Sequence, residues 1–330
     1  MGLIFNYIIT IHNKESLIEK VLDSVVKCSH ENSFIYPVFD GCTDKSEEIV
    51  DDFIAKHSSV NIIKLFANDV HEILSINIGL RAANQLSDGY NIILQDDVIL
   101  MDYDLEAKIH RLYEKIGGKL AYISFRLGAN LKDVDNMSFK DYVESAYGHG
   151  IDNTKILLPG QFAFRSIAIK SPVCIPTRII REFGLLDENL APCFHDDTEY
   201  CLRMIKNGYL NGVFALKYES ELDWGGTRKN PNPNYERYIK NNLTYLKKVY
   251  PVEMNQLINS KQDKKIISYK DFINSSINKD ALRLYKNSQK IRKKYEIGNM
   301  TAIEKIKYYL SISVFRGPYR YVVSLLKMLG

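Results

Sequence analysis

The chain has 330 residues, of which 45% are hydrophobic and 25% charged, so it is long and apolar enough to bury a large core. No stretch approaches the run of about 18 apolar residues that a membrane-spanning helix needs, which favours an ordinary soluble α/β protein. The formal net charge of +4 hides an asymmetry, because residues 1–227 contain 22 Lys and Arg against 33 Asp and Glu, whereas residues 228–330 contain 22 against 7.

The basic C-terminal part and the cysteines bear on partners and location. A basic segment of this kind usually meets phosphates, anionic lipid or an acidic partner. The five cysteines are scattered, with no paired metal-ligand spacing, which favours a reducing compartment and hence a cytoplasmic protein. The apolar run that opens the chain is too short for a signal peptide and is expected to be a strand.

Apolar runs and helical spacings alternate along the first hundred residues. We expect strands at 3–11, 34–39, 60–66 and 90–100, and helices that start after Asn13, after Ser46 and at Ile73. Asn13 is a plausible N-cap for the first of these helices. This rhythm predicts right-handed βαβ units and a parallel sheet. A Rossmann dehydrogenase and a P-loop enzyme are both disfavoured, because neither glycine-rich phosphate motif occurs.

The alternation continues after residue 100, with one long interruption. Helices are predicted at 102–116, 176–183 and 197–206, and strands at 121–127, 162–169 and 210–216. In residues 128–160 the apolar residues have no regular spacing, and Asn, Asp, Gly, Tyr and His are frequent. A loop of this length inside a compact domain more often has a function than not.

Two adjacent carboxylates, Asp96 and Asp97, interrupt the apolar run 90–100 (YNIILQDDVIL). A buried strand cannot carry them in its middle without a partner, so they should mark its carboxyl end. Ligands bind at that end of the strands in open α/β sheets. Paired oxygen ligands there suggest a divalent metal, with a diphosphate on its far side.

The turns that follow these strands resemble, in their order and spacing, those of the family 2 glycosyltransferases, which are inverting nucleotide-sugar enzymes with the GT-A fold. The resemblance runs from about residue 3 to residue 251. The family's Pro-x-Tyr-Asn-Glu-like turn is matched by Thr10, His12, Asn13 and, one step late, Glu15. Its Asp-Asp-Gly-Ser-Thr-Asp turn is similar to residues 39–44.

The acidic motifs of the family imply the catalytic roles. Its metal-binding Asp-x-Asp resembles Gln95-Asp96-Asp97, which implies Asp97 as a ligand of Mn²⁺ or Mg²⁺ and Asp96 as its helper in the nucleotide site. Its Glu-Asp-x-Asp resembles residues 196–199, so Asp196 and Asp197 would be the catalytic acids, with Asp197 as the general base. A late His-x-Gly-Gly-like segment is matched by residues 223–226, where Asp223 is the candidate further ligand in place of a histidine.

Further residues are candidates for binding the donor and acceptor. Asp40 is placed to contact the nucleotide base, and backbone at Thr10 and His12 with the side chain of Glu15 could hold base and ribose. Arg81 could reach the diphosphate bidentately. Trp224 and Tyr147 could stack on sugar faces.

Each of these candidates has a structural alternative. An acid after a strand can be a turn former or a helix cap, an arginine can belong to a solvated helix face, and a tryptophan can belong to the core. For the histidines 12, 149 and 195 we favour local hydrogen bonding over ligation.

The basic region beyond residue 251 carries two amphipathic segments, at 302–310 and after Gly317-Pro318. Such helices can lie on an anionic membrane, where enzymes of this class meet lipid-linked acceptors. Alternatively, they cap the catalytic domain or form a contact between two copies in a homo-oligomer. The aromatic and basic interleaving of single-strand binders is missing, so no nucleic acid partner is expected.

Taken together, we expect an α/β, GT-A-like (Rossmann-like), mostly parallel central sheet flanked by helices in residues 1–250, with a basic helical C-terminal appendage in 251–330. The expected activity is metal-dependent, inverting transfer of one sugar from a nucleotide-diphosphate donor, UDP most often, to a glycan or glycolipid in cell-surface polysaccharide or glycoconjugate synthesis. The alternatives are a nucleotidyltransferase with a related fold and a non-catalytic nucleotide- or lipid-binding protein. A cytoplasmic enzyme, peripheral on the inner face of the membrane, fits this interpretation.

Overall fold

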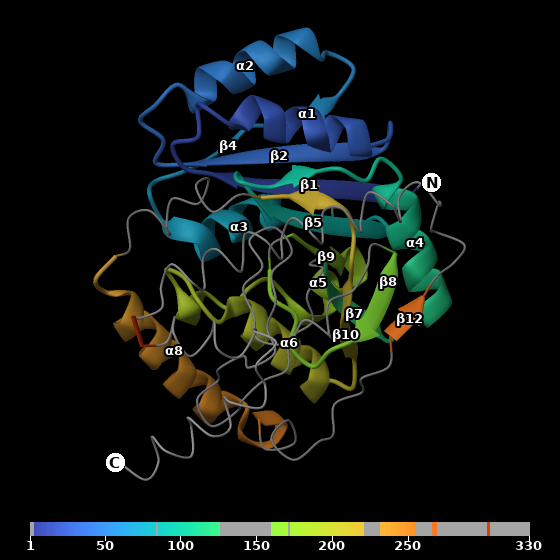
Figure 1. Ribbon diagram of the computed structural model, residues 1–330, viewed down its shortest axis with the longest axis vertical. Coiled ribbons are helices and arrows are strands. Elements are labelled where there is room, and N and C mark those ends of the chain that lie inside the picture. The colour runs from blue at the N-terminus through green and yellow to red at the C-terminus, as the bar shows by residue number, and fades with distance from the viewer. Residues whose placement is uncertain are drawn as a thin grey trace.

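The computed structural model describes residues 3–83, 85–125, 160–170, 172–220, 232–254, 266–268 and 302–303 (Figure 1). In this part of the chain a ten-stranded sheet has helices on both faces. Its central strands are parallel, and antiparallel strands join them on one side. The mostly parallel sheet flanked by helices that the sequence predicted is therefore confirmed.

The N-terminal half supplies the parallel centre of the sheet. The central strand β1 pairs in parallel with β2 on one side and with β5 on the other. The elements in order are β1 (Ile4–Ile11), α1 (Ile18–Cys28), β2 (Ser33–Asp40), α2 (Ser46–Lys56), β3 (Asn61–Ile62), β4 (Leu65–Ala67), α3 (His71–Ala82) and β5 (Gly89–Gln95).

The second half extends the sheet with mixed pairing. The strand order is β12-β8-β10-β7-β9-β5-β1-β2-β3, and β4 pairs with β2 beside β3. The elements are β6 (Ile99–Leu100), α4 (Leu105–Ile116), β7 (Leu120–Ser124), β8 (Gln161–Phe164), β9 (Val173–Pro176), α5 (Thr177–Phe183), the 3-10 turn η2 (Glu188–Leu190), α6 (Asp196–Lys206), β10 (Leu210–Phe214), β11 (Tyr218–Glu219), α8 (Tyr235–Val249) and β12 (Ile266–Ser268).

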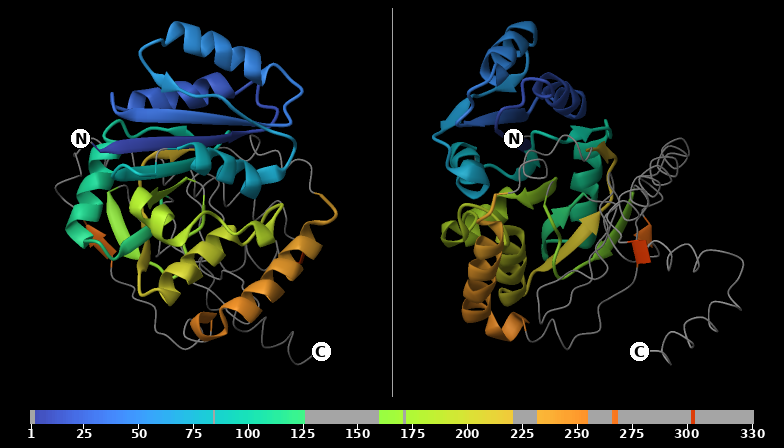
Figure 2. Two further views of the ribbon diagram at one scale, coloured as in Figure 1. Left: turned by 180° about the vertical axis from the view of Figure 1, so that it is seen from behind. Right: turned by 60° about the vertical axis from the view of Figure 1, so that its left-hand side comes forward.

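Side chains that alternate along the strands divide the core into two layers. On β1, Ile8 packs with residues of α3, α5, α6 and α8. Its neighbours Tyr7 and Ile9 pack on the opposite face with residues of α1, α2 and α4. Figure 2 shows α8 beside α6 on the first of these faces. The helix α6, which carries the candidate acids Asp196 and Asp197, therefore lies in the same layer as α8.

Several predicted elements differ in detail. The predicted strand 60–66 is two short strands, and the predicted strand 162–169 ends at Phe164. The antiparallel β9 was not predicted, because four buried residues leading into a helix carry no alternation. Asn13 does not cap α1, which starts at Ile18. Its backbone is left-handed, with φ of 51°, and its side chain contacts the next loop instead.

The region beyond residue 250 contributes at least one strand to the sheet. The backbone of β12 pairs antiparallel with β8, so this region does not consist of helices alone. The two amphipathic segments predicted in the C-terminal region lie outside the described residues, except for 302–303, which are helical. Among the described helices, none has both the length and the apolar character needed to span a bilayer.

Candidate active site

The carboxyl ends of β1, β2 and β5 meet at one edge of the sheet, as parallel neighbours must. His12 follows β1, Asp40 ends β2, and Asp96 follows β5. The backbone N–H of His12 donates to Asp96 Oδ2 over 2.8 Å. Nδ1 of the same histidine is 2.6 Å from the Asp40 carbonyl oxygen. The three strand ends are thereby joined through His12, which makes the local hydrogen bond predicted for it.

Asp96 has protein partners for both carboxylate oxygens. Besides the His12 N–H on Oδ2, Lys14 Nζ lies 3.5 Å from Oδ1. Burial, together with the neighbouring Asp97, raises the pKa of Asp96 to about 7 against the opposing effect of Lys14. Sequence reasoning missed Lys14, because a lysine in a turn is usually a solvated charge.

Three of the predicted nucleotide-binding side chains fix the loops at this edge: Asn13 and Glu15 join the loops after β1 and β2, and Asp40 holds the segment before α3. Asn13 Oδ1 accepts from the Thr43 N–H at 2.8 Å, and Glu15 Oε2 accepts from the Lys45 N–H at 3.0 Å. Asp40 Oδ1 accepts from the Val70 N–H at 2.7 Å. Thr10 is part of β1, opposite Gln95 of β5. These residues therefore shape the edge of the sheet as well as being candidates for ligand contact.

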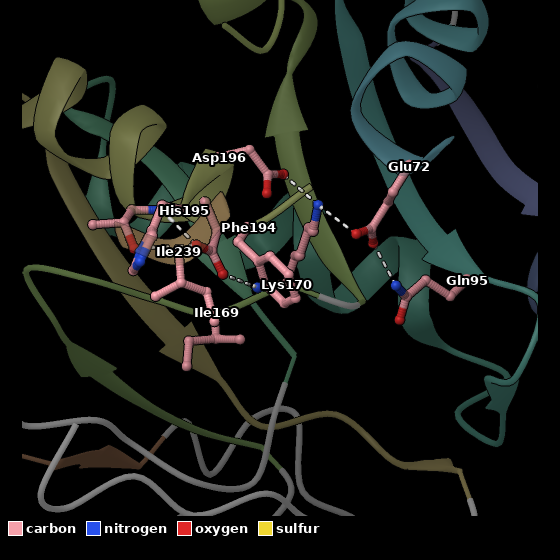
Figure 3. Close-up of a pocket in the computed structure, with 10 residues that line it drawn as sticks. Glu72, Gln95, Ile169, Lys170, Phe194, His195, Asp196 and Ile239 are labelled. Atoms are coloured by element: carbon pink, nitrogen blue, oxygen red, sulfur yellow. Dashed lines mark hydrogen bonds and ion pairs between the residues drawn. The ribbon is translucent and has the colours of Figure 1, made fainter. Parts of the chain in front are cut away.

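A cavity of about 310 Å³ opens beside this edge, between the end of β5 and the start of α6 (Figure 3). It combines ionisable groups with apolar side chains, and α3, β5, α6 and α8 all contribute to its wall. Its lining residues are Glu72, Gln95, Ile169, Lys170, Phe194, His195, Asp196, Asp197, Thr198 and Ile239.

Asp197 occupies the first turn of α6, where helix N–H groups favour a carboxylate. Its Oδ1 accepts from the Thr198 N–H at 2.6 Å, and its Oδ2 accepts from the Lys170 N–H at 3.3 Å. Desolvation raises the pKa of Asp197 to about 6, the adjacent Asp196 adds to the rise, and Lys170 opposes it. A carboxylate with a raised pKa in the wall of a cavity is suited to accept a proton.

The segment before α6 has an unusual backbone that places these acids. Phe194 and His195 are both left-handed, with φ of 75° and 64°, a conformation that side chains other than glycine adopt at a cost. The segment is held by α8, because the Asn242 amide donates to the carbonyls of Leu190, Cys193 and Phe194, each at 2.9 Å. For His195 the expected local hydrogen bond is not found, since its buried Nε2 has no partner in the described part of the structure.

The family model described as glycosyl transferase family 2 matches residues 7–189, which is more than half of the chain. The chain belongs to glycosyl transferase family 2. The resemblance in the turns after the strands is thereby confirmed, and the protein is a glycosyltransferase. No protein with a curated description matches the sequence.

Solved structures that this glycosyltransferase resembles include S. aureus TarS, residues 1–349, at 14% identity, with 93% of this chain and 78% of that chain covered and a TM-score of 0.49. The same TarS fragment in complex with UDP matches at 14% identity, 89% and 92% coverage and a TM-score of 0.47. The mannosyltransferase PcManGT from Pyrobaculum calidifontis, in complex with GDP-Man and Mn²⁺, matches at 11% identity, 97% and 83% coverage and 0.47. The family assignment itself comes from the match in sequence.

The structure of this family 2 glycosyltransferase brings some predicted residues to the cavity and leaves others away from it. Gln95 lines it together with Asp196 and Asp197, and Asp97 follows two residues beyond Gln95. Arg81 lies at the last turn of α3 and forms an exposed ion pair with Glu188. The structure therefore does not bring Arg81 to the cavity wall. Asp223, Trp224 and Tyr147 lie outside the described residues.

Two charged residues of the cavity were not predicted. Lys170 Nζ pairs with Asp196 and lies 3.2 Å from Glu72 Oε2, and the Gln95 amide donates to Glu72 (Figure 3). Lys170 follows the apolar run 167–169 directly, which is the same signal that identified Asp96 and Asp97. Glu72 offered no such signal, because a first-turn acid on a helix is ordinary.

A divalent metal is implied by the acidic motif after β5, and the residues present can be tested against it. No group of three or more His, Cys, Asp or Glu able to hold a metal occurs among the described residues. Mg²⁺ and similar ions are, however, often held by one or two carboxylates together with substrate phosphates. The family motif after β5 implies Asp97 as the carboxylate for such a role, and Asp96 beside it is engaged by His12 and Lys14.

Proposed function

We propose that this glycosyltransferase moves one sugar, with inversion, from a nucleotide-diphosphate donor to a hydroxyl of a glycan or glycolipid. A UDP-sugar is the proposed donor. The single observation that carries the proposal is Asp197, a first-turn carboxylate of raised pKa that shares a cavity wall with Gln95 from the metal-motif strand. Such a wall offers a proton acceptor beside the place where the leaving group would sit.

The reaction would be a single in-line displacement at the anomeric carbon. The acceptor oxygen forms the new bond to this carbon while its proton passes to the Asp197 carboxylate. The bond from the same carbon to the diphosphate oxygen breaks, and its electron pair leaves with the nucleoside diphosphate. Attack from the face opposite the leaving group inverts the anomeric centre. Proton transfer to a placed carboxylate contributes about 10²- to 10⁴-fold to the rate.

The donor would be bound at the edge formed by β1, β2 and β5. Asp97 is the proposed ligand of Mn²⁺ or Mg²⁺, which when bound would neutralise charge on the diphosphate. Asp40, Glu15 and backbone near Thr10 and His12 are the proposed contacts of base and ribose. Asn13 and Asp96 support these contacts by fixing the two loops and the His12 backbone.

The remaining predictions stay proposals. We propose Asp223 as a further metal ligand, and Trp224 and Tyr147 as sugar-stacking surfaces. Arg81 is proposed to contact the diphosphate after it leaves its present partner, Glu188. The basic region 251–330 is proposed to meet an anionic membrane surface, as expected for an enzyme of cell-surface polysaccharide or glycoconjugate synthesis.

Thermal unfolding in the presence of nucleotides and Mn²⁺ tests the donor assignment. A ligand that binds only the folded protein at 100 times its dissociation constant stabilises by about 2.7 kcal/mol. We expect stabilisation that requires both a nucleoside diphosphate and Mn²⁺, and release of nucleoside diphosphate from a sugar nucleotide. Release of pyrophosphate from a nucleoside triphosphate and a sugar phosphate would instead identify a nucleotidyltransferase. Binding without turnover of any donor and acceptor would favour the non-catalytic alternative.

A further inference from the structure

Lys170 is a cation enclosed by three acids in the cavity. Its Nζ forms ion pairs with Asp196 and with Glu72, the latter at 3.2 Å, and Figure 3 shows it between these two carboxylates. Its backbone N–H donates to Asp197 Oδ2 over 3.3 Å. The side chain is only 11% exposed. One residue therefore contacts both neighbouring acids of α6, each through a different group.

Burial of this lysine requires the acids around it. A desolvated ammonium is costly unless it is paired. Burial alone would lower the pKa of Lys170, but Asp196, Glu72 and Asp197 together raise it above the ordinary value. Lys170 therefore stays charged over the whole range in which a carboxylate titrates.

The contacts of the two acids differ in a way that separates their roles. Asp196 is 1% exposed and is held by the Lys170 ammonium, whereas the described partners of Asp197 are backbone N–H groups and the Thr198 hydroxyl. We propose that Lys170 is a positioning residue that, by holding Asp196 as a paired carboxylate, leaves Asp197 as the group that receives the acceptor's proton. This inference rests on the proposed function.

Ionisable groups face Asp197 from several elements. The start of α6 brings Asp196 and the preceding His195. On the same helix, burial raises the pKa of Cys201, and Asp197 adds to this rise. The segment after β8 brings Lys170, and α3 brings Glu72. The lining residue from β5 is the neutral Gln95, and that from α8 is the apolar Ile239. Within the described residues, Lys170 is the positive charge that lowers the pKa of Asp197.

The test is the pH dependence of kcat/KM for nucleoside diphosphate release from UDP-glucose, UDP-N-acetylglucosamine and GDP-mannose with Mn²⁺. Removing a cation next to a carboxylate raises its pKa by about 1 to 3 units. In Lys170→Met, the fall in activity at acid pH should therefore begin about 1 to 3 pH units higher than in the unchanged protein. Lys170→Arg, which keeps the charge, should return the acid limb of the pH profile, where activity falls, to its original position. Lys64→Met, which removes a lysine paired with Glu47 and Asp51, is the matched control and should leave the limb in place.

A purely structural role for Lys170 would lower the rate without moving the acid limb, and that result would overturn the inference. Asp196→Asn provides a second route if Lys170→Met does not fold. The turnover that remains in Asp196→Asn should fall off at lower pH than in the unchanged protein, because the negative charge next to Asp197 is removed. Loss of all turnover in Asp196→Asn would mean that Asp196 is itself the base, which contradicts the inference. If the unchanged protein releases no nucleoside diphosphate from these donors or any other sugar nucleotide, the proposed function is wrong, and so is the inference about Lys170.

Discussion

The side-chain amide of Asn242, on α8, donates a 2.9 Å hydrogen bond to the backbone carbonyl of Phe194, two residues before Asp196. Asn242 is buried, and its amide also reaches the carbonyls of Leu190 and Cys193. The family match ends at residue 189, so a helix beyond the matched region holds the segment that places Asp196 and Asp197.

Asn242→Ala should destabilise the protein by about 1 to 3 kcal/mol, because buried carbonyls lose their donor. Turnover should fall as well, since the segment 190–195 sets the position of Asp197. Urea unfolding measures the first effect. The control is Asn207→Ala, which removes an exposed hydrogen bond to the Arg203 carbonyl and should cost less than about 0.5 kcal/mol. Equal stability of the two variants would contradict this role for Asn242.

A second link joins α8 to α6 through the Tyr250 hydroxyl, which donates to the buried Glu199 carboxylate. Glu199 also accepts from Arg203 Nε at 2.9 Å. Tyr250→Phe removes a hydrogen bond to a charged group and should cost about 1.5 to 3 kcal/mol of folding free energy. Tyr103→Phe, at a side chain that is 63% exposed, should be close to neutral in the same denaturation experiment. A neutral Tyr250→Phe would show that Glu199 is satisfied by Arg203 alone.

The close approach of β5 to β1 depends on Gly89. A Cβ at this position would lie 1.9 Å from the Ile4 carbonyl oxygen, which is backbone and cannot turn aside. Gly89→Ala should therefore destabilise by about 3 kcal/mol or more, through overpacking at the centre of the sheet. Gly118→Ala meets no atom within 4 Å and should change stability by less than about 0.5 kcal/mol. Thermal unfolding of the two variants side by side checks the contrast.

The sequence predicted the parallel centre of the fold because its strands are buried on both faces and read as continuous apolar runs. Of the antiparallel strands, β8 was predicted as a strand but its pairing was not, and β9 and β12 were not predicted at all. They are short, and their partners are distant in sequence, as in the pairing of β9 with both β5 and β7. Local periodicity contains no information on such pairings.

The acids of the candidate site were predictable where they directly follow an apolar run or match a motif of the family. Asp96 and Asp97 were found in the first way and Asp197 in the second, and Asp197 does line the cavity. Arg81 stays a proposal, because the structure shows its guanidinium paired with Glu188 and periodicity alone gives no sign of that partner. Lys14 and Lys170 were missed because their importance comes from carboxylates 82 and 26 positions away, which only the fold brings into contact.

The raised pKa of Asp197 has a consequence for stability. A carboxyl whose pKa is about 6 in the folded protein, against an ordinary 3.8, binds its proton more tightly when folded. Its ionisation therefore costs stability, and the cost grows from about pH 4 and is complete above about pH 6. Asp197→Asn avoids this cost. It should stabilise the protein at pH 8 by about 1 kcal/mol or more relative to its effect at pH 4.

Urea unfolding of the unchanged protein and of Asp197→Asn, at both pH values, measures this difference. A gain in stability that is the same at pH 4 and pH 8 would show that Asp197 titrates normally in the folded protein. In that case its role as a proton acceptor near neutral pH would lose its physical basis.

The central claim is that Asp97 binds the metal ion, whereas Asp197 accepts the proton of the acceptor hydroxyl. The most direct test measures nucleoside diphosphate release by Asp197→Asn. Donor binding by the same variant is measured separately, from the thermal shift in the presence of Mn²⁺. We predict that Asp197→Asn binds the donor like the unchanged protein but turns over about 10²- to 10⁴-fold more slowly, whereas Asp97→Asn loses the metal-dependent thermal shift. Turnover by Asp197→Asn at the rate of the unchanged protein would contradict the account.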